Sequence, residues 1–232
     1  MTKLIDNIET KTVIDRVTGK LEVTYTYKRK RCPTIKLSSK LTKSYIGYYL
    51  IENDLADIES WLNIAYSHIP KNNKNKSKDN YLITDIENDS VVKGLFMSSV
   101  AFYGKCFTQA KGRGLKLDKS FVPNEYYALH DKIMNYRHTL VAHSGKGEWD
   151  TGVLKLVLPP KKGKSISPCI KPELKRLSFI DDKEDDYRFI NLVVLLKEKV
   201  RKKSNEVAKR IFSDEIKKKT EDYWYKQAKA NK

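Results

Sequence analysis

The sequence predicts a mainly helical fold of four long helices with two β-containing additions. Apolar residues recur at helical spacing in four long segments, alternating apolar and polar residues mark two others, and turn-forming residues separate them. At 232 residues the chain is long enough to bury a core without disulfides or metal ions. We therefore expect one main domain with extensions.

The first addition is a β-hairpin predicted over residues 10–28. Two β-rich runs flank Thr18-Gly19-Lys20, as in a hairpin turn. The second run alternates through Leu21, Val23, Tyr25 and Tyr27. Together with the basic run at 28–31, the hairpin forms an N-terminal extension that we assign to residues 1–38.

The first predicted helix spans residues 39–68. Ser39 or Thr42 can cap its start, and Pro70 closes it. The following stretch, 71–80, has nothing to bury, so we expect a solvated loop there.

The second predicted helix begins at Asp89 or Ser90 and continues to about Ala110. Lys111-Gly112-Arg113-Gly114 ends it. Its Gly-Arg-Gly sequence is typical of a helix stop, although contact with a phosphate is the alternative.

The third predicted helix begins near Pro123 and ends before Ser144-Gly145. A β-containing insertion follows over 146–184, with one run from Val153 to Leu158 and a second near 177–180. A long C-terminal helix over 185–232 starts at Asp185 or Asp186. The insertion and the C-terminal helix follow a helical core that we assign to residues 39–145.

The chain is strongly basic, with 46 Lys and Arg against 29 Asp and Glu and a net charge of +17. A polyanion is the expected partner, and we favour nucleic acid over an acidic protein, an anionic membrane or plain solvation. The four C-terminal basic residues Lys197, Arg201, Lys202 and Lys203, together with Arg113, are the candidates for contact with RNA phosphates.

Cysteine spacing and hydropathy exclude several classes of protein. Cys32, Cys106 and Cys169 are far apart and form no CxxC pair, so we expect reduced thiols without a disulfide framework or a zinc site. The first 20 residues lack an apolar signal core, and no later stretch resembles a membrane span. We expect a cytoplasmic protein without membrane contact.

The third predicted helix carries the sharpest functional signal, Arg137-His138-Thr139-Leu140-Val141-Ala142-His143. On an ideal helix Arg137 and His143 are separated by about 9 Å along the axis and about 120° around it. They border one cleft only if another element packs against this edge, and the simplest such element is the same helix of a second copy. Capping of the helix end by Arg and His is the alternative.

These residue types suit RNA cleavage without a metal or other cofactor. A neutral imidazole can take the proton of a ribose 2′-OH or give one to the leaving 5′-oxygen. A guanidinium can hold the phosphate. We predict His143 as general acid/base, Arg137 as phosphate clamp and His138 as a polar helper. For His130 and the nearby tyrosines we favour structural roles, with base stacking as the alternative for the tyrosines.

Residues 130–144 resemble the motif helix of the HEPN superfamily, whose members carry Arg-x(4 to 6)-His, often with a polar residue directly after the Arg. Arg137, His138 and His143 match that pattern, and residues 102–107 look like the helix that precedes it in the abortive-infection and toxin branch. The resemblance covers roughly residues 40–145, and residues 185–230 only by pattern.

The resemblance implies an up-down four-helix bundle, a homodimer with facing motifs, and a metal-independent endoribonuclease in a toxin or antiviral defence setting. An antitoxin or another regulatory protein would be a further partner. Two other hypotheses remain open, namely a non-catalytic RNA-binding or dimerisation scaffold of this fold and an adaptor for an acidic protein.

Overall fold

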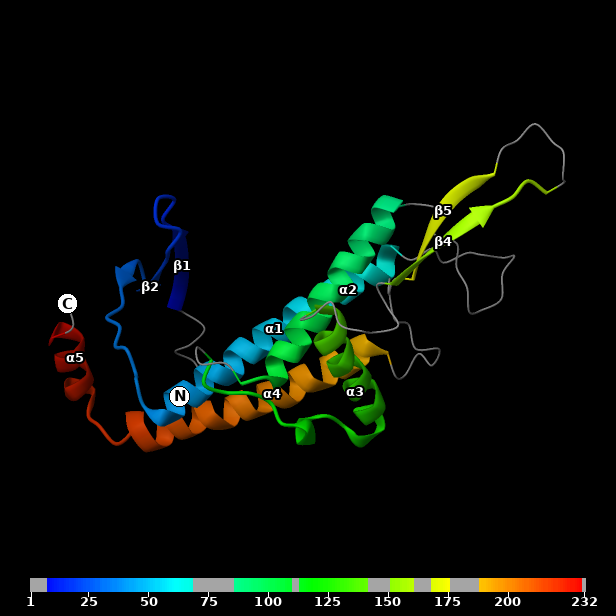
Figure 1. Ribbon diagram of the computed structural model, residues 1–232. Helices are drawn as coiled ribbons and strands as arrows, with labels where there is room; N and C mark the ends of the chain where they lie inside the picture. Colours follow the sequence, from blue (N-terminus) through cyan, green and yellow to red (C-terminus); the bar gives the residue numbers. More distant parts are fainter. Residues whose placement is uncertain are drawn as a thin grey trace. The chain divides into compact units, whose positions relative to one another are not determined.

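The computed structural model describes residues 8–68, 86–109, 113–141, 151–160, 168–175 and 188–230. In these ranges the protein is mainly helical, as predicted, with a small antiparallel sheet near the N-terminus (Figure 1). The chain divides into two compact units, one formed by residues 1–42 and 208–232 and the other by residues 43–207. None of the described helices contains an apolar stretch long enough to cross a bilayer.

The N-terminal sheet confirms the predicted hairpin. Strands β1 (Ile8–Ile14) and β2 (Leu21–Tyr27) pair antiparallel, and the side chain of Asp15 accepts hydrogen bonds from the backbone of the turn that joins them. Gly19 takes a positive φ of 66° there, which glycine adopts without strain. A two-residue turn with positive φ at both positions then leads into the short strand β3 (Lys30–Arg31), which the sequence did not predict.

The first two predicted helices are present. Helix α1 (Lys40–His68) begins where predicted, because the Ser39 hydroxyl accepts the backbone N–H of Thr42 at 3.0 Å. Helix α2 (Ile86–Phe107) begins three residues earlier than Asp89.

The third predicted helix is divided. Helix α3 (Tyr127–Tyr136) follows two short 3₁₀ turns, η2 (Lys119–Phe121) and η3 (Asn124–Tyr126), and leads into a π-helical turn, η4 (Arg137–Val141). Pro123 lies in extended conformation before η3, so the α-helix begins four residues later than predicted. The prediction of one continuous α-helix from Pro123 is therefore wrong at its start and at Arg137, where the α-helix becomes a π turn, and its predicted end before Ser144 lies outside the described residues.

The predicted second β element is a hairpin of β4 (Thr151–Val157) and β5 (Cys169–Lys175). The partner of the first run is thus β5, while the predicted run near 177–180 lies outside the described residues. Proline at position 172 is tolerated because both strands of a two-stranded sheet have a free edge.

The C-terminal region is two helices rather than the one long helix predicted over 185–232. Helix α4 (Phe189–Ile211) passes into a π-helical segment, η6 (Phe212–Ile216), and α5 (Glu221–Ala230) follows a turn. The Thr220 hydroxyl accepts the backbone N–H of Tyr223 at 3.3 Å, which starts a new helix at this point. Trp224 donates from Nε1 to the Ile216 carbonyl at 3.2 Å, which ties α5 to the end of η6.

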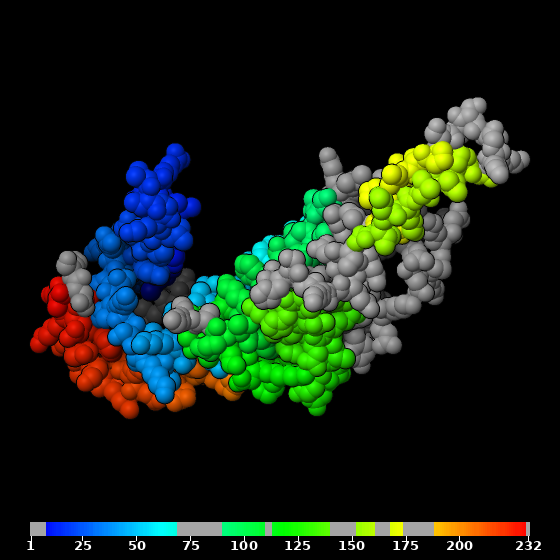
Figure 2. All heavy atoms as spheres, viewed as in Figure 1, coloured from blue at the N-terminus to red at the C-terminus, as the bar shows by residue number. Residues whose placement is uncertain are grey.

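Helices α1 to α4 lie close together (Figure 1) and share the main hydrophobic core, which is formed by their buried side chains. Ion pairs join Glu52 to Arg201 and Glu59 to Lys197. The later residue of α1 thus pairs with the earlier residue of α4, so the two helices run antiparallel. The fully buried members with the largest side chains include Tyr103, Phe96, Ile51, Leu55, Ile58 and Leu62. In the other unit, Figure 2 shows α5 beside the segment that follows β3.

Candidate functional site

Arg137 stands at the junction between α3 and the π-helical turn. Its backbone is helical, with φ −58° and ψ −42°, and its N–H donates to the carbonyls of Ile133 and Met134. A π turn bonds residues five apart instead of four, so the ideal-helix spacing predicted between Arg137 and His143 does not hold across this segment. His143 itself lies outside the described residues. π turns inside α-helices occur frequently at functional sites.

Gly104 of α2 provides the surface on which the Arg137 side chain lies. A Cβ atom added at Gly104 would be 2.6 Å from Cγ and 2.9 Å from Cδ of Arg137. Only a residue without a side chain leaves room for this stem against the helix backbone. The half-buried Arg137 is therefore held along α2 by the absence of a side chain at position 104.

His138 lies beside the guanidinium of Arg137. Its Nδ1 is 3.4 Å from Nη1 of Arg137, at the long end of hydrogen-bond distances, and its side chain is exposed. In this arrangement the guanidinium donates and an unprotonated Nδ1 accepts. The structure thus brings two of the three predicted catalytic residues together.

His130 is buried and structural, as favoured from the sequence. Its Nδ1 lies 2.8 Å from the hydroxyl of Tyr103, and its ring is 4.6 Å from the ring of Phe107. Burial lowers the pKa of His130, an effect that Asp131 opposes and Lys119 reinforces. Burial also raises the pKa of Tyr103 well above its usual value, so its hydroxyl stays protonated and can donate to a neutral imidazole.

The lowered pKa of His130 predicts a loss of stability in mild acid. Below the ordinary histidine pKa of about 6.5 the unfolded chain binds a proton that the folded chain excludes, so stability falls as the pH drops from 6.5 towards the folded-state pKa. We expect Tm to decrease less between pH 7 and pH 5 in His130→Gln than in the parent protein. Equal decreases in both proteins would show that His130 does not contribute to this pH dependence.

Arg113, a predicted RNA contact, is committed to an internal ion pair. Its guanidinium pairs with the carboxylate of Asp54, and only 6% of its side chain is exposed. Lys105 completes the cluster, with Nζ 3.1 Å from the same carboxylate. Arg113 is therefore not part of the RNA surface that we propose, since its charge is neutralised and covered.

The predicted basic residues of α4 differ in their availability. Lys197 pairs with Glu59 and is 19% exposed, whereas Arg201 pairs with Glu52 at 2.7 Å but remains 60% exposed. Lys203 pairs with Glu206 at 2.8 Å on the surface, and Lys202 is exposed. Arg201, Lys202 and Lys203 thus face solvent, and Lys197 mainly joins α4 to α1.

Gly104 is the site residue that sequence reasoning missed. A glycine inside a helix costs about 1 kcal/mol relative to alanine, and that cost is the available signal for a close approach at this position. Asp54 carried no comparable signal, because a single carboxylate in an amphipathic helix is ordinary.

Comparisons with known proteins identify no related site. No protein-family model matches the chain, and comparisons with curated proteins and with solved structures find no match. Among the described residues, His, Cys, Asp and Glu side chains form no group of three or more with the proximity needed to hold a metal ion.

Proposed function

We propose that this protein is an endoribonuclease that cleaves RNA through attack by the ribose 2′-OH without a metal ion. The observation that supports it best is the position of Arg137, held against Gly104 at the start of a π turn with His138 beside its guanidinium. A guanidinium fixed in this way can bind a phosphate without first losing side-chain freedom.

In the proposed reaction, His143 transfers protons and Arg137 binds the phosphate. A neutral imidazole accepts the proton of the 2′-OH, whose oxygen attacks the adjacent phosphorus while the bond to the 5′-oxygen breaks. That leaving oxygen takes a proton from the imidazolium, which restores the neutral imidazole. Arg137 stabilises the charge that develops on the phosphate oxygens. His138, which contacts Arg137, orients the guanidinium. The products carry a 2′,3′-cyclic phosphate and a 5′-hydroxyl.

A dimer is part of this proposal. Helices α1 to α4 would form the HEPN-type bundle, and a second copy would bring its motif helix against the first, so that the two Arg137 and His143 pairs border one cleft. The toxin or phage-defence setting rests on the sequence resemblance alone. Size-exclusion chromatography with light scattering should give a mass of twice the 26.9 kDa of one chain.

Analysis of cleavage products tests the reaction. The full chain is incubated with single-stranded and structured RNAs in EDTA, and the fragment ends are identified. We expect 2′,3′-cyclic phosphate and 5′-hydroxyl ends. Fragments with 5′-phosphate ends would contradict attack by the 2′-OH, and intact RNA would favour the second candidate.

The second candidate is a non-catalytic RNA-binding protein of the same fold. The charge distribution favours it, because the unit of residues 1–42 and 208–232 holds 18 Lys and Arg against 8 Asp and Glu, outside the predicted motif. RNA affinity in the absence of any cleavage product would support this candidate.

A further inference from the structure

We propose that the unit of residues 1–42 and 208–232 binds an unpaired base of single-stranded RNA in an aromatic cavity. This inference deepens the proposed function, because it adds a second site for the same class of substrate. It rests on that function only for the choice of RNA, and its test does not require cleavage.

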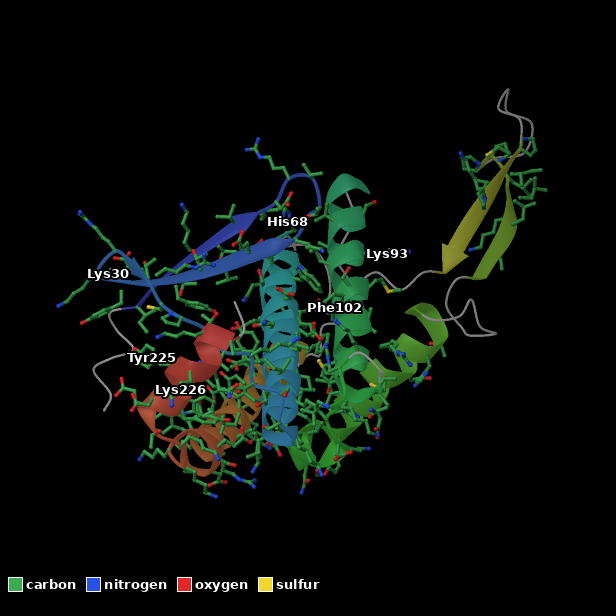
Figure 3. All side chains as sticks on the ribbon, turned by 90° about the vertical axis from the view of Figure 1, so that its left-hand side faces the viewer. Lys30, His68, Lys93, Phe102, Tyr225 and Lys226 are labelled. Atoms are coloured by element: carbon green, nitrogen blue, oxygen red, sulfur yellow. The ribbon has the colours of Figure 1, made fainter. Side chains whose placement is uncertain are left out.

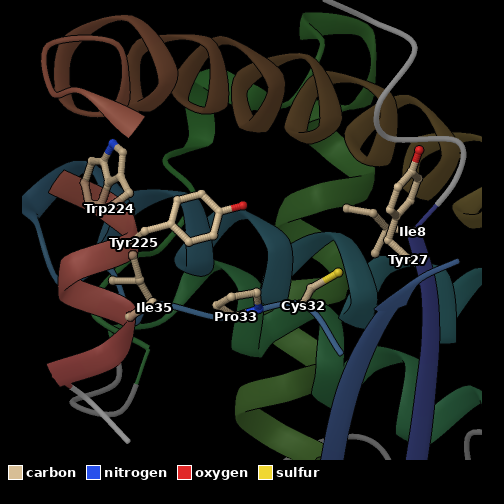
Figure 4. Close-up of a pocket in the computed structure, with 8 residues that line it drawn as sticks. Ile8, Tyr27, Cys32, Pro33, Ile35, Trp224 and Tyr225 are labelled. Atoms are coloured by element: carbon tan, nitrogen blue, oxygen red, sulfur yellow. The ribbon is translucent and has the colours of Figure 1, made fainter. Parts of the chain in front are cut away.

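The cavity lies between α5 and the segment around β2 and β3, entirely within this unit (Figure 4). Its volume is about 330 Å³, at the small end of the range for ligand sites. The walls include three aromatic side chains, Tyr27, Trp224 and Tyr225, and the apolar Pro33, Ile35 and Ala228. A flat ring fits this lining better than a charged ligand does.

Two of the aromatic walls are accessible and the third is fixed. Tyr225 is 53% exposed and Tyr27 is 36% exposed, so both can receive a ligand from solvent. Trp224 is held by its hydrogen bond to the Ile216 carbonyl and by an edge contact with Tyr223, whose ring centroid is 5.1 Å away. A base entering here would meet rings that are partly ordered in advance.

Basic side chains lie near one wall of the cavity, at Tyr27. Nζ of Lys28 lies 5.5 Å from the centroid of the Tyr27 ring, and the basic run 28–31 continues from it. Lys30, Tyr225 and Lys226 lie toward the same side of the view in Figure 3. Acidic side chains are fewer than basic ones in this unit. The carboxylate of one of them, Glu9, accepts a hydrogen bond from the Thr26 hydroxyl at 3.3 Å.

Aromatic faces combined with basic side chains suit single-stranded nucleic acid. Bases stack on the rings while Lys and Arg contact the phosphates, and each stacked base contributes about 1–3 kcal/mol. An apolar peptide would use only the cavity, and an acidic peptide would use only the charges. RNA uses both features.

Fluorescence anisotropy with a short labelled oligouridylate tests this site in full-length His143→Ala protein. We expect Tyr225→Ala to weaken binding about tenfold and Tyr225→Phe to retain the parental affinity, because the phenyl ring still stacks. Tyr49→Ala, which removes a tyrosine of similar exposure (49%) from the other unit, should leave affinity unchanged.

An abasic oligonucleotide of equal charge separates base binding from charge attraction. His143→Ala protein should bind it about tenfold more weakly than oligouridylate, whereas His143→Ala protein that also carries Tyr225→Ala should bind both equally. The proposal would be overturned if Tyr225→Ala left the affinity for oligouridylate unchanged, or if it lowered the affinity for both oligonucleotides by the same factor. Since binding is read in a His143→Ala background, either result leaves the cleavage proposal untouched.

Discussion

Replacement of Gly104 with alanine is expected to reduce RNA cleavage about 100-fold without lowering Tm. The new Cβ would lie 2.6 Å from Cγ of Arg137, so the flexible arginine stem must move off α2 and carry its guanidinium out of position. The helix itself gains about 1 kcal/mol from alanine, which offsets the cost of moving the arginine stem and leaves Tm unchanged. Initial cleavage rates and thermal unfolding measure the two effects separately.

Gly94 offers a matched control on the same helix. A Cβ at Gly94 meets nothing within 4 Å, so Gly94→Ala should raise stability by roughly 0.5–1 kcal/mol and leave cleavage unchanged. If Gly104→Ala cleaves RNA as fast as the parent protein, the contact with α2 does not position Arg137 for catalysis.

Replacement of Asp54 with alanine is expected to lower the free energy of unfolding by roughly 3–5 kcal/mol. The change leaves the guanidinium of Arg113, only 6% exposed, without its carboxylate partner. It also frees Lys105, which loses less because half of its side chain already faces solvent. Denaturant unfolding of the variant and the parent measures the difference.

An exposed ion pair provides the comparison. Lys203→Ala breaks the surface pair with Glu206 and should cost less than about 1 kcal/mol. If Asp54→Ala also lowers the free energy of unfolding by less than about 1 kcal/mol, the buried pair between Asp54 and Arg113 does not stabilise the fold.

Local sequence predicted the elements whose signals lie within a few residues. Ser39 caps α1 through its own side chain, and Gly19 takes the positive φ that the first hairpin needs. The π turns at Arg137 and Phe212 were not predicted, because each is a single turn at the end of a helix, where too few apolar residues follow to reveal the one-residue shift in their spacing. The division of the C-terminal region into α4 and α5 falls after the second of them, at the turn before Thr220.

The candidate site was predicted only where one segment carries it. Arg137 and His138 are neighbours in sequence, and the structure places their side chains in contact. Arg113 pairs with Asp54, 59 positions away, so charge alone did not reveal which basic residues are already neutralised. Gly104 acts through a side chain 33 residues later, a contact that only the packing of α2 against the motif region establishes.

The most direct test of RNA cleavage by Arg137 and His143 is the rate at which Arg137→Ala and His143→Ala cleave a labelled single-stranded RNA in EDTA, compared with the parent. We expect cleavage by the parent and a loss of at least about 100-fold in each variant, with Tm and oligomeric mass unchanged. Cleavage at the parental rate by either folded variant would contradict the assignment of that residue to the site.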